Sequence, residues 1–182
     1  MAAVHPIRDL GDLERMKEYL FRGNVKYYIL FTIGLNTGLR ISDILNLKVS
    51  DVRGKSHVTI VEKKSKKPKR FLINSELKAD IDFFLKYTPD DRYLICGTRD
   101  RNKRMRTAQA YRMISDAAKY VGITDAVGTH TMRKTFGYHH YKKNKDIVML
   151  MRLFNHSKPD TTLLYIGITD DEMDASLEGF HL

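Results

Sequence analysis

The sequence lacks the features that would place it in a membrane, a disulfide-rich fold or a chain of several domains. Its single cysteine, Cys96, excludes an internal disulfide, and no apolar run approaches the roughly eighteen residues that a membrane span needs. The N-terminus has no basic head followed by an apolar segment, and the four prolines are dispersed rather than gathered in a linker. These absences predict one soluble, cytoplasmic domain covering residues 1–182.

What the chain has in excess is positive charge. Lysine and arginine number 32 against 22 aspartates and glutamates, so the formal net charge is +10. This surplus suits a polyanionic partner, for which nucleic acid and an anionic membrane would each fit. One basic run occupies residues 63–70 and a second occupies 99–106. A single charged run is often only an exposed turn, but two runs in a basic chain favour a groove for a long phosphate backbone.

Hydrophobic spacing predicts a mainly α fold with a small antiparallel β-sheet, an α+β domain. Apolar residues recur at helical intervals between Ser75 and Pro89, between Thr107 and Gly122 and after Asp146, with a shorter stripe over 173–180. Residues 57–73 depart from this pattern, because two short apolar segments flank the basic loop as in a β-hairpin. The apolar stretch around Cys96 is interpreted as a buried strand, with Cys96 a core residue rather than a reactive thiol.

Two motifs in the chain present arginines. At 37–43 the sequence reads Thr-Gly-Leu-Arg-Ile-Ser-Asp, in which the glycine allows a sharp turn between two apolar helices and places Arg40 at the start of the second. The alternative to a functional role is a buried ion pair between Arg40 and Asp43. His130 and Arg133 are spaced to share one helical face, where they could hold a phosphate, although a surface helix has the same pattern.

A further motif, Phe-Asn-His-Ser-Lys-Pro at 154–159, precedes Tyr165, which follows His156 by nine residues. Histidines could instead bind a metal if His130, His139, His140 and His156 converged. The chain lacks a second cysteine, an H-E-x-x-H pattern and a carboxylate at ligand spacing, so no metal is expected.

The order and spacing of these motifs resemble the tyrosine recombinase, or phage integrase, family over nearly the whole chain from Pro6. The shared pattern is an arginine in T-G-L-R-x-S-[DE], a lysine in a basic hairpin about twenty-four residues later, H-x-x-R downstream, and then the His and Tyr nine apart. The hairpin at 62–67 is most similar to that of conjugative-transposon integrases. The resemblance implies the catalytic-domain fold of this family, and a site-specific recombinase that cleaves and rejoins DNA through a 3′-phosphotyrosine.

The resemblance also implies a role for each matching residue. In that family the tyrosine attacks the scissile phosphate, two arginines stabilise the transition state, a hairpin lysine protonates the leaving 5′-oxygen, two histidines assist, and an acidic residue positions its neighbours. Carried over in that order, the residues are Tyr165, Arg40 with Arg133, Lys64, His130 with His156, and Asp43. Lys63 and Lys66 are close enough in sequence to leave the choice of lysine open. No cofactor, metal or small-molecule substrate is implied.

The resemblance implies double-stranded DNA as the partner. It also implies that four copies of the chain assemble as a homo-tetramer on the DNA, while the free chain can be a monomer. The residues expected to contact DNA are Lys63, Lys66, Lys67, Lys69, Arg70, Arg104 and Arg106. A C-terminal helix over 170–182 is expected to pack into a neighbouring protomer or fold back on its own core. The N-terminal helical domain of the family is not expected in this chain. Two alternatives share the fold: a non-catalytic DNA-binding regulator and a type IB topoisomerase.

Overall fold

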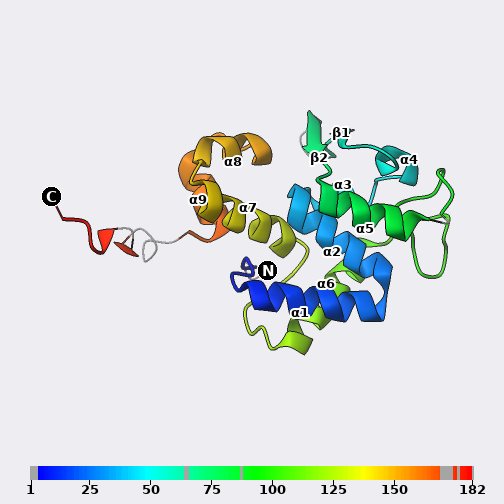
Figure 1. Cartoon of the computed structure of the whole chain (residues 1–182), viewed down its shortest axis with the longest axis horizontal. Coiled ribbons are helices and arrows are strands. Elements are labelled where there is room, and N and C mark those ends of the chain that lie inside the picture. The colour runs from blue at the N-terminus through cyan, green and yellow to red at the C-terminus, as the bar shows by residue number, and fades with distance from the viewer. Residues whose placement is uncertain (1–3, 64–65, 87, 169–173, 176, 182) are drawn as a thin grey trace.

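The fold is that of a computed structural model, which describes residues 4–63, 66–86, 88–168, 174–175 and 177–181. Helices make up most of the described chain, and one two-stranded antiparallel sheet accompanies them (Figure 1). In chain order the elements are α1 (Leu10–Gly23), α2 (Val25–Thr37), α3 (Ile41–Ile44), α4 (Val49–Val52), β1 (His57–Val61), β2 (Pro68–Leu72), α5 (Ser75–Leu85), α6 (Thr107–Val121), α7 (Thr131–Asn144), α8 (Ile147–Phe154) and α9 (Pro159–Ile166).

Helix α2 is the centre of the main core. Its sequence is apolar on nearly every side, so it is stable only when covered all round. Helices α1, α5, α6 and α7 pack against it and provide that cover. A second, smaller core lies between α7, α8 and α9, where Leu150, Phe154 and Ile166 are buried. These three helices form one end of the molecule, across from the hairpin (Figure 1).

Gly137 allows α7 to approach α8 and α9 closely. A β-carbon at this position would lie 2.6 Å from Cγ2 of Ile166 and 2.8 Å from the Phe154 ring. Only a residue without a side chain avoids this overlap. Because Arg133 lies one helical turn before Gly137, the close packing brings that arginine next to the ends of α8 and α9.

The hairpin register determines which of its side chains point inward. Strand β1 pairs antiparallel with β2 from His57 opposite Leu72 to Val61 opposite Pro68. Phe71 is buried, and side chains alternate along a strand, so Lys69 faces the same buried side. The hairpin therefore carries one of its lysines into the molecule.

The structure confirms the helices expected after Ser75, Thr107 and Asp146 and the hairpin at 57–73. The strand expected at 93–96 is wrong: the chain there forms only isolated bridges, Lys48 to Tyr93 and Cys96 to Arg104. Leu94 and Ile95 are buried as a strand would have them, but Cys96 is only half-buried. A short apolar run predicts that a segment is buried, but it does not predict whether the backbone of that segment pairs with another strand.

Residues 174–175 and 177–181, near the C-terminus, lie away from the body of the molecule (Figure 1). Of the stripe expected over 173–180, Met173 is outside the described residues, while Leu177 and Phe180 are 64% and 66% exposed. In the described part of this stripe, these two side chains are therefore not covered by the chain's own core, and packing into a neighbouring protomer stays a prediction. Across all the residues that the structure describes, no helix is both long enough and apolar enough to cross a bilayer.

Candidate active site

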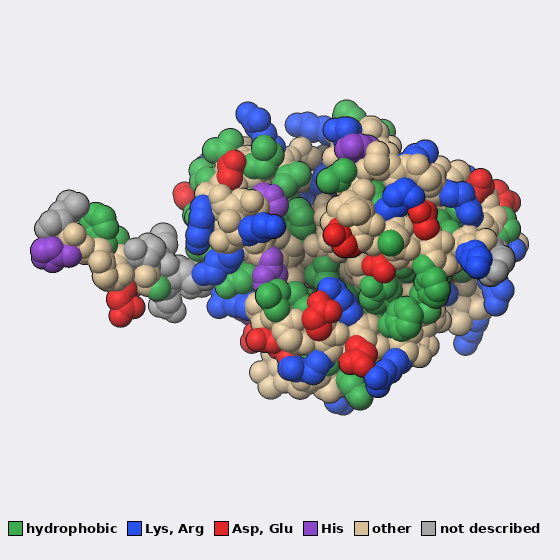
Figure 2. Space-filling model, viewed as in Figure 1, with side chains coloured by type: hydrophobic (Ala, Val, Ile, Leu, Met, Phe, Trp, Pro, Cys, Tyr) green, Lys and Arg blue, Asp and Glu red, His purple; other side chains and the backbone are tan. Residues whose placement is uncertain are grey.

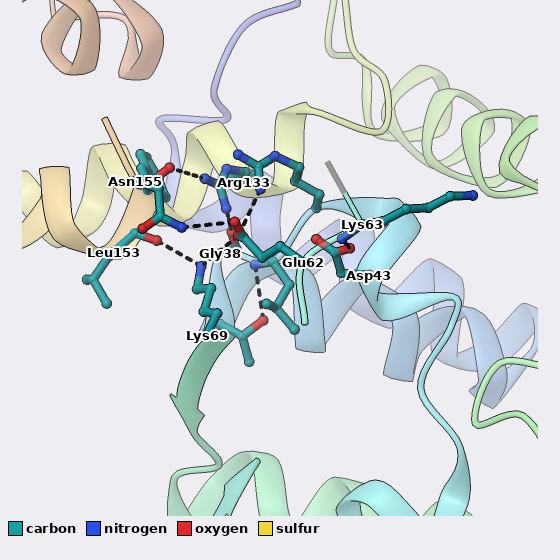
Figure 3. Close-up of polar contacts among 12 residues, drawn as sticks. Gly38, Asp43, Glu62, Lys63, Lys69, Arg133, Leu153 and Asn155 are labelled. Carbon is teal, nitrogen blue, oxygen red and sulfur yellow. Dashed lines mark hydrogen bonds and ion pairs between the residues drawn. The ribbon is translucent and has the colours of Figure 1, made fainter. Parts of the chain in front are cut away.

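Arg40 is positioned by the turn that ends α2. Gly38 adopts the left-handed conformation that stops the helix, with φ of 59°, and Arg40 then precedes α3 in an extended conformation. The guanidinium does not pair with Asp43, as the sequence alternative had it. Its Nη1 lies 2.8 Å from Oε1 of Glu62, and Asp43 instead accepts a hydrogen bond from the backbone N–H of Lys63 at 3.0 Å (Figure 3). Arg40 is thus connected to the hairpin rather than to its own helix.

Among the expected site residues that the structure describes, Arg133 is the most buried, with 2% of its surface exposed. It donates to the carbonyl of Gly38 and, at 3.0 Å, to the carbonyl of Phe154. The guanidinium also lies over the Phe154 ring, with Cζ 4.2 Å from the ring centroid. Burial lowers the pKa of Arg133, and the Tyr165 hydroxyl, to which it is hydrogen-bonded, raises it in part. Arg133 therefore joins the Arg40 turn, the end of α8 and the tyrosine.

Tyr165 lies on α9 against an aromatic cluster. Its ring meets those of His156 and Phe154 edge to face, with centroids 5.3 Å and 5.5 Å away. Burial raises the pKa of the phenol, while the charges of Arg133 and Arg40 and a hydrogen bond from Arg133 oppose that rise without cancelling it. The tyrosine is consequently protonated at neutral pH and needs further positive charge or a base before it can attack.

His156 follows a left-handed residue at the end of α8. Asn155 has φ of 56°, a conformation that asparagine tolerates, and the His156 N–H then bonds to the carbonyl of Met151 at 2.9 Å. The His156 Nδ1 is 3.0 Å from Oγ1 of Thr162, whose hydroxyl donates to the carbonyl of Lys158. Burial, followed by the charges of Arg133 and Arg40, lowers the pKa of His156, so its ring is neutral in the free protein.

His130 immediately precedes α7 and is exposed, whereas Arg133 three residues later is buried. The two side chains share the start of one helix but not one environment. Among the other histidines, His139 contacts the carbonyl of Ile7 at 3.0 Å. In the described ranges no three histidine, cysteine, aspartate or glutamate side chains are grouped as metal ligands.

The hairpin lysines separate into two groups. One group is exposed and consists of Lys63, Lys66, Lys67 and Arg70. The Lys63 side chain points away from Arg133 (Figure 3). Lys69 is only 8% exposed, and its Nζ donates to the carbonyl of Leu153 at 2.8 Å. The expectation that Lys69 binds DNA as a surface residue is thus wrong in this structure, because strand alternation turns it inward. Lys64, the expected general acid, lies outside the described residues.

Arg104 and Arg106 belong to a separate basic cleft. Arg106 is exposed at the N-terminus of α6, and the cleft of about 710 Å³ beside it is also lined by Arg99, Lys103 and Arg112. The positive end of α6 adds to this charge.

A second hollow lies between the α8 side of the molecule and the hairpin side. Figure 2 shows lysine and arginine side chains on both sides of it.

Some residues of the site were not singled out from the sequence. Glu62, which accepts from Arg40, is fully buried. Lys134 places its Nζ 5.3 Å from the centroid of the Tyr165 ring, and burial lowers the pKa of this lysine. No pattern in the sequence indicates that Lys134 belongs to the site, because the tyrosine that it contacts, Tyr165, lies far along the chain. Only the alternation with Phe71 could have placed Lys69 inside.

Solved structures of a recombinase and an integrase share this fold. The crystal structure of XerA recombinase matches with a TM-score of 0.78 at 23% identity, covering 96% of this chain and 65% of that one. The Tn1549 transposon integrase in complex with transposon right end DNA matches with a TM-score of 0.73 at 17% identity, covering 98% of this chain and 66% of that one. The fold is thus the tyrosine recombinase catalytic-domain fold, as the sequence resemblance implied.

The chain belongs to the phage integrase family, whose model matches residues 11–172. The probable integrase/recombinase YoeC of Bacillus subtilis is 44% identical over 180 residues, which cover 99% of this chain and 98% of that protein. Tyrosine recombinase XerA of Pyrococcus furiosus is 25% identical over 174 residues, covering 94% of this chain but 60% of XerA. The match thus spans 98% of one relative and 60% of the other. Family membership favours site-specific recombination over the regulator and topoisomerase alternatives.

Proposed function

We propose that this chain cleaves and rejoins DNA strands by transesterification at Tyr165. The phenolic oxygen bonds to the scissile phosphorus as the bond from phosphorus to the 5′-oxygen breaks. The phenol loses its proton, the departing 5′-oxygen gains one, and a 3′-phosphotyrosine remains. Attack on that link by the 5′-hydroxyl of a partner strand reverses the step and exchanges strands. The phosphodiester energy stays in the enzyme link, so no high-energy cofactor is consumed.

The observation that carries this proposal is the position of Arg133. Its guanidinium donates to the turn that presents Arg40 and to the end of α8, which leads into His156. The charge of Arg133, and after it a side-chain hydrogen bond, lower the pKa of Tyr165 against the effect of burial. A phosphate bound beside the phenol would meet two fixed guanidinium groups, which stabilise the extra negative charge of the transition state without reorganising. Arginine suits this task because its fork stays charged and matches two phosphate oxygens.

Proton transfer is assigned by resemblance. Lys64 on the hairpin is the proposed acid for the 5′-oxygen, and His130 the proposed acid or base near the tyrosine. The hydroxyl of Thr162 uses its one hydrogen to donate to the backbone carbonyl of Lys158. Nδ1 of His156 therefore carries the proton and donates to the Thr162 oxygen, which leaves Nε2 of the neutral ring as an acceptor. His156 would therefore donate to the phosphate only when protonated, which the negative charge of bound DNA favours.

A nicked suicide substrate tests this function against the two alternatives. Duplexes recovered by selection from a random pool supply the site, and a nick beside the scissile phosphate lets the short 5′-hydroxyl strand diffuse away and trap the link. We expect a covalent protein–DNA product on a denaturing gel. A non-catalytic regulator would bind these duplexes without forming that product, and a topoisomerase would relax any supercoiled plasmid without site preference.

DNA binding is proposed to use the exposed hairpin cations and the basic cleft beside α6. Replacing Lys67 or Arg70 by glutamine should weaken binding several-fold and reduce the slope of log affinity against log salt by about one for each phosphate that the variant no longer neutralises. The measurement is a salt titration by fluorescence anisotropy on one selected duplex. Lys119→Gln, an exposed change at the far end of α6, is the control. An unchanged slope in the hairpin variants would contradict the proposed groove.

The C-terminal segment is proposed to join protomers in a tetramer on DNA. Leu177 and Phe180 expose apolar surface that water disfavours, and a neighbouring copy could cover it. The double variant L177S/F180S should shift DNA-bound complexes from tetramers to smaller species in light scattering, while single-site binding stays near the parent value. The exposed change Leu164→Ser on α9 serves as the control. Tetramers that persist in the double variant would rule out this segment as the link.

A further inference from the structure

A buried carboxylate lies among the cations of the site. Glu62 follows β1 and is 0% exposed, so both of its oxygens must find partners within the protein. Its Oε1 lies 2.8 Å from Nη1 of Arg40 and 3.9 Å from Nζ of Lys69, and its Oε2 accepts from Nδ2 of Asn155 at 2.9 Å. One side chain thus contacts the catalytic arginine and the residue just before His156 (Figure 3).

Lys69 makes a second connection beside this carboxylate. Its ammonium donates to the carbonyl of Leu153 in the last turn of α8, so β2 is bonded to the segment that leads into the His156 turn. A carboxylate is destabilising inside a protein unless positive charge compensates it, and Lys69 and Arg40 provide that charge. The pair therefore ties the hairpin to both the Arg40 turn and the end of α8.

This arrangement leaves Arg40 available to a phosphate. Glu62 contacts one terminal nitrogen of the guanidinium, whose five N–H donors exceed what that contact uses. The Arg40 side chain is 19% exposed, in contrast to the full burial of Glu62. The carboxylate can thus hold the Arg40 guanidinium in one orientation from its buried side and leave the exposed side to a phosphate.

We propose that Glu62 and Lys69 are positioning residues for the reaction: Glu62 orients Arg40 and the Asn155–His156 turn, and Lys69 holds the hairpin against α8. This inference rests on the proposed function, because orientation of Arg40 matters only if Arg40 binds the scissile phosphate. The role is distinct from that of the lysine assigned as general acid. Neither residue touches the reacting atoms; both act through Arg40 and the His156 turn.

The first test needs no DNA and is independent of the proposed function. Side-chain ¹⁵Nε NMR of the full chain resolves arginine signals, and a fixed Arg40 should give a sharp, dispersed signal. In Glu62→Gln, which keeps the shape and removes the charge, that signal should move toward the free-arginine position and broaden. Glu18→Gln breaks the matched surface pair with Arg22 and should leave Arg40 unchanged. An Arg40 signal that is the same in Glu62→Gln and the parent overturns the proposal.

The second test follows cleavage of the suicide substrate. Glu62→Gln and Lys69→Met should lower the rate of covalent product at saturating DNA by about tenfold to a hundredfold, because misorientation of a catalytic group has costs of that order. DNA affinity should change less than about twofold in both. Thermal melts identify any variant that is simply unfolded, and Lys69→Arg, which restores the cation, should recover most of the rate. Parent-like rates in Glu62→Gln and Lys69→Met would overturn the proposal.

The pH dependence separates positioning from general packing. Burial, followed by the charge of Arg133, lowers the pKa of Lys69 to about 8, with Arg40 lowering it and Glu62 and Asp43 raising it. These groups come from α7, the start of α3 and the hairpin, and the Leu153 carbonyl faces Lys69 from α8. Above pH 8 the neutral lysine no longer balances Glu62, so kcat/KM of the parent should fall on the alkaline side.

Lys69→Arg stays charged and should shift that alkaline limb upward, whereas a purely structural role would move the melting temperature and leave the limb in place. A limb that is unchanged in Lys69→Arg contradicts the role of Lys69. If the parent chain forms no covalent product at any pH, the proposed function fails, and the NMR comparison still decides whether Glu62 orients Arg40.

Discussion

Tyr165→Phe should abolish the covalent protein–DNA product and leave DNA affinity nearly unchanged. The substitution removes one oxygen from a ring that packs edge to face on His156 and Phe154, so the aromatic contacts persist. The substitution takes away the hydroxyl whose pKa the charge of Arg133 lowers against the effect of burial, and with it the proposed nucleophile. The measurement is the fraction of a suicide duplex that migrates with the protein on a denaturing gel, alongside anisotropy binding of the same duplex.

Tyr120→Phe is the matched control, since Tyr120 is exposed on α6 and stacks on Tyr19. It should form covalent product at the parent rate. A Tyr165→Phe protein that still becomes linked to DNA would mean that another residue is the nucleophile.

Arg133→Lys should have the second largest effect. Lysine keeps the charge but cannot reach the Gly38 carbonyl, the Phe154 carbonyl and the Tyr165 hydroxyl at once, as the arginine fork does. We expect the cleavage rate at saturating DNA to fall by about 10²–10³-fold, the range seen when one transition-state donor is removed. The free energy of unfolding should fall by about 1–3 kcal/mol, because a buried carbonyl loses its donor.

The rate and stability effects of Arg133→Lys can be separated by assaying well below the melting temperature of the variant. Arg22→Lys, a change at an exposed position on α1, should alter neither quantity. A folded Arg133→Lys protein that cleaves at the parent rate would remove Arg133 from the chemistry and leave it a packing role.

The sequence carried enough information to predict the elements that depend on local patterns. Helices α5, α6 and α8 follow from apolar spacing with a capping residue at each start or a glycine at the end, and the hairpin follows from two β-rich segments around a basic loop. The left-handed turn at Gly38 was expected for the same kind of local reason.

Partners that are distant along the chain could not be read from spacing. Arg40 lies three residues from Asp43, which suggested a pair, yet it pairs with Glu62 because the hairpin folds back over the start of α3. The basic loop suggested that every lysine faces solvent, yet strand alternation buries Lys69. Both differences arise where tertiary packing chooses among charged groups that are equally available in the sequence.

Mass spectrometry of the trapped complex tests the central claim most directly. The parent chain is reacted with the suicide duplex, the DNA is digested with nuclease, and the protein is cleaved to peptides and sequenced. The account predicts a residual nucleotide joined through phosphate to Tyr165. A nucleotide carried by any other residue, or a complex that yields no modified peptide, would contradict it.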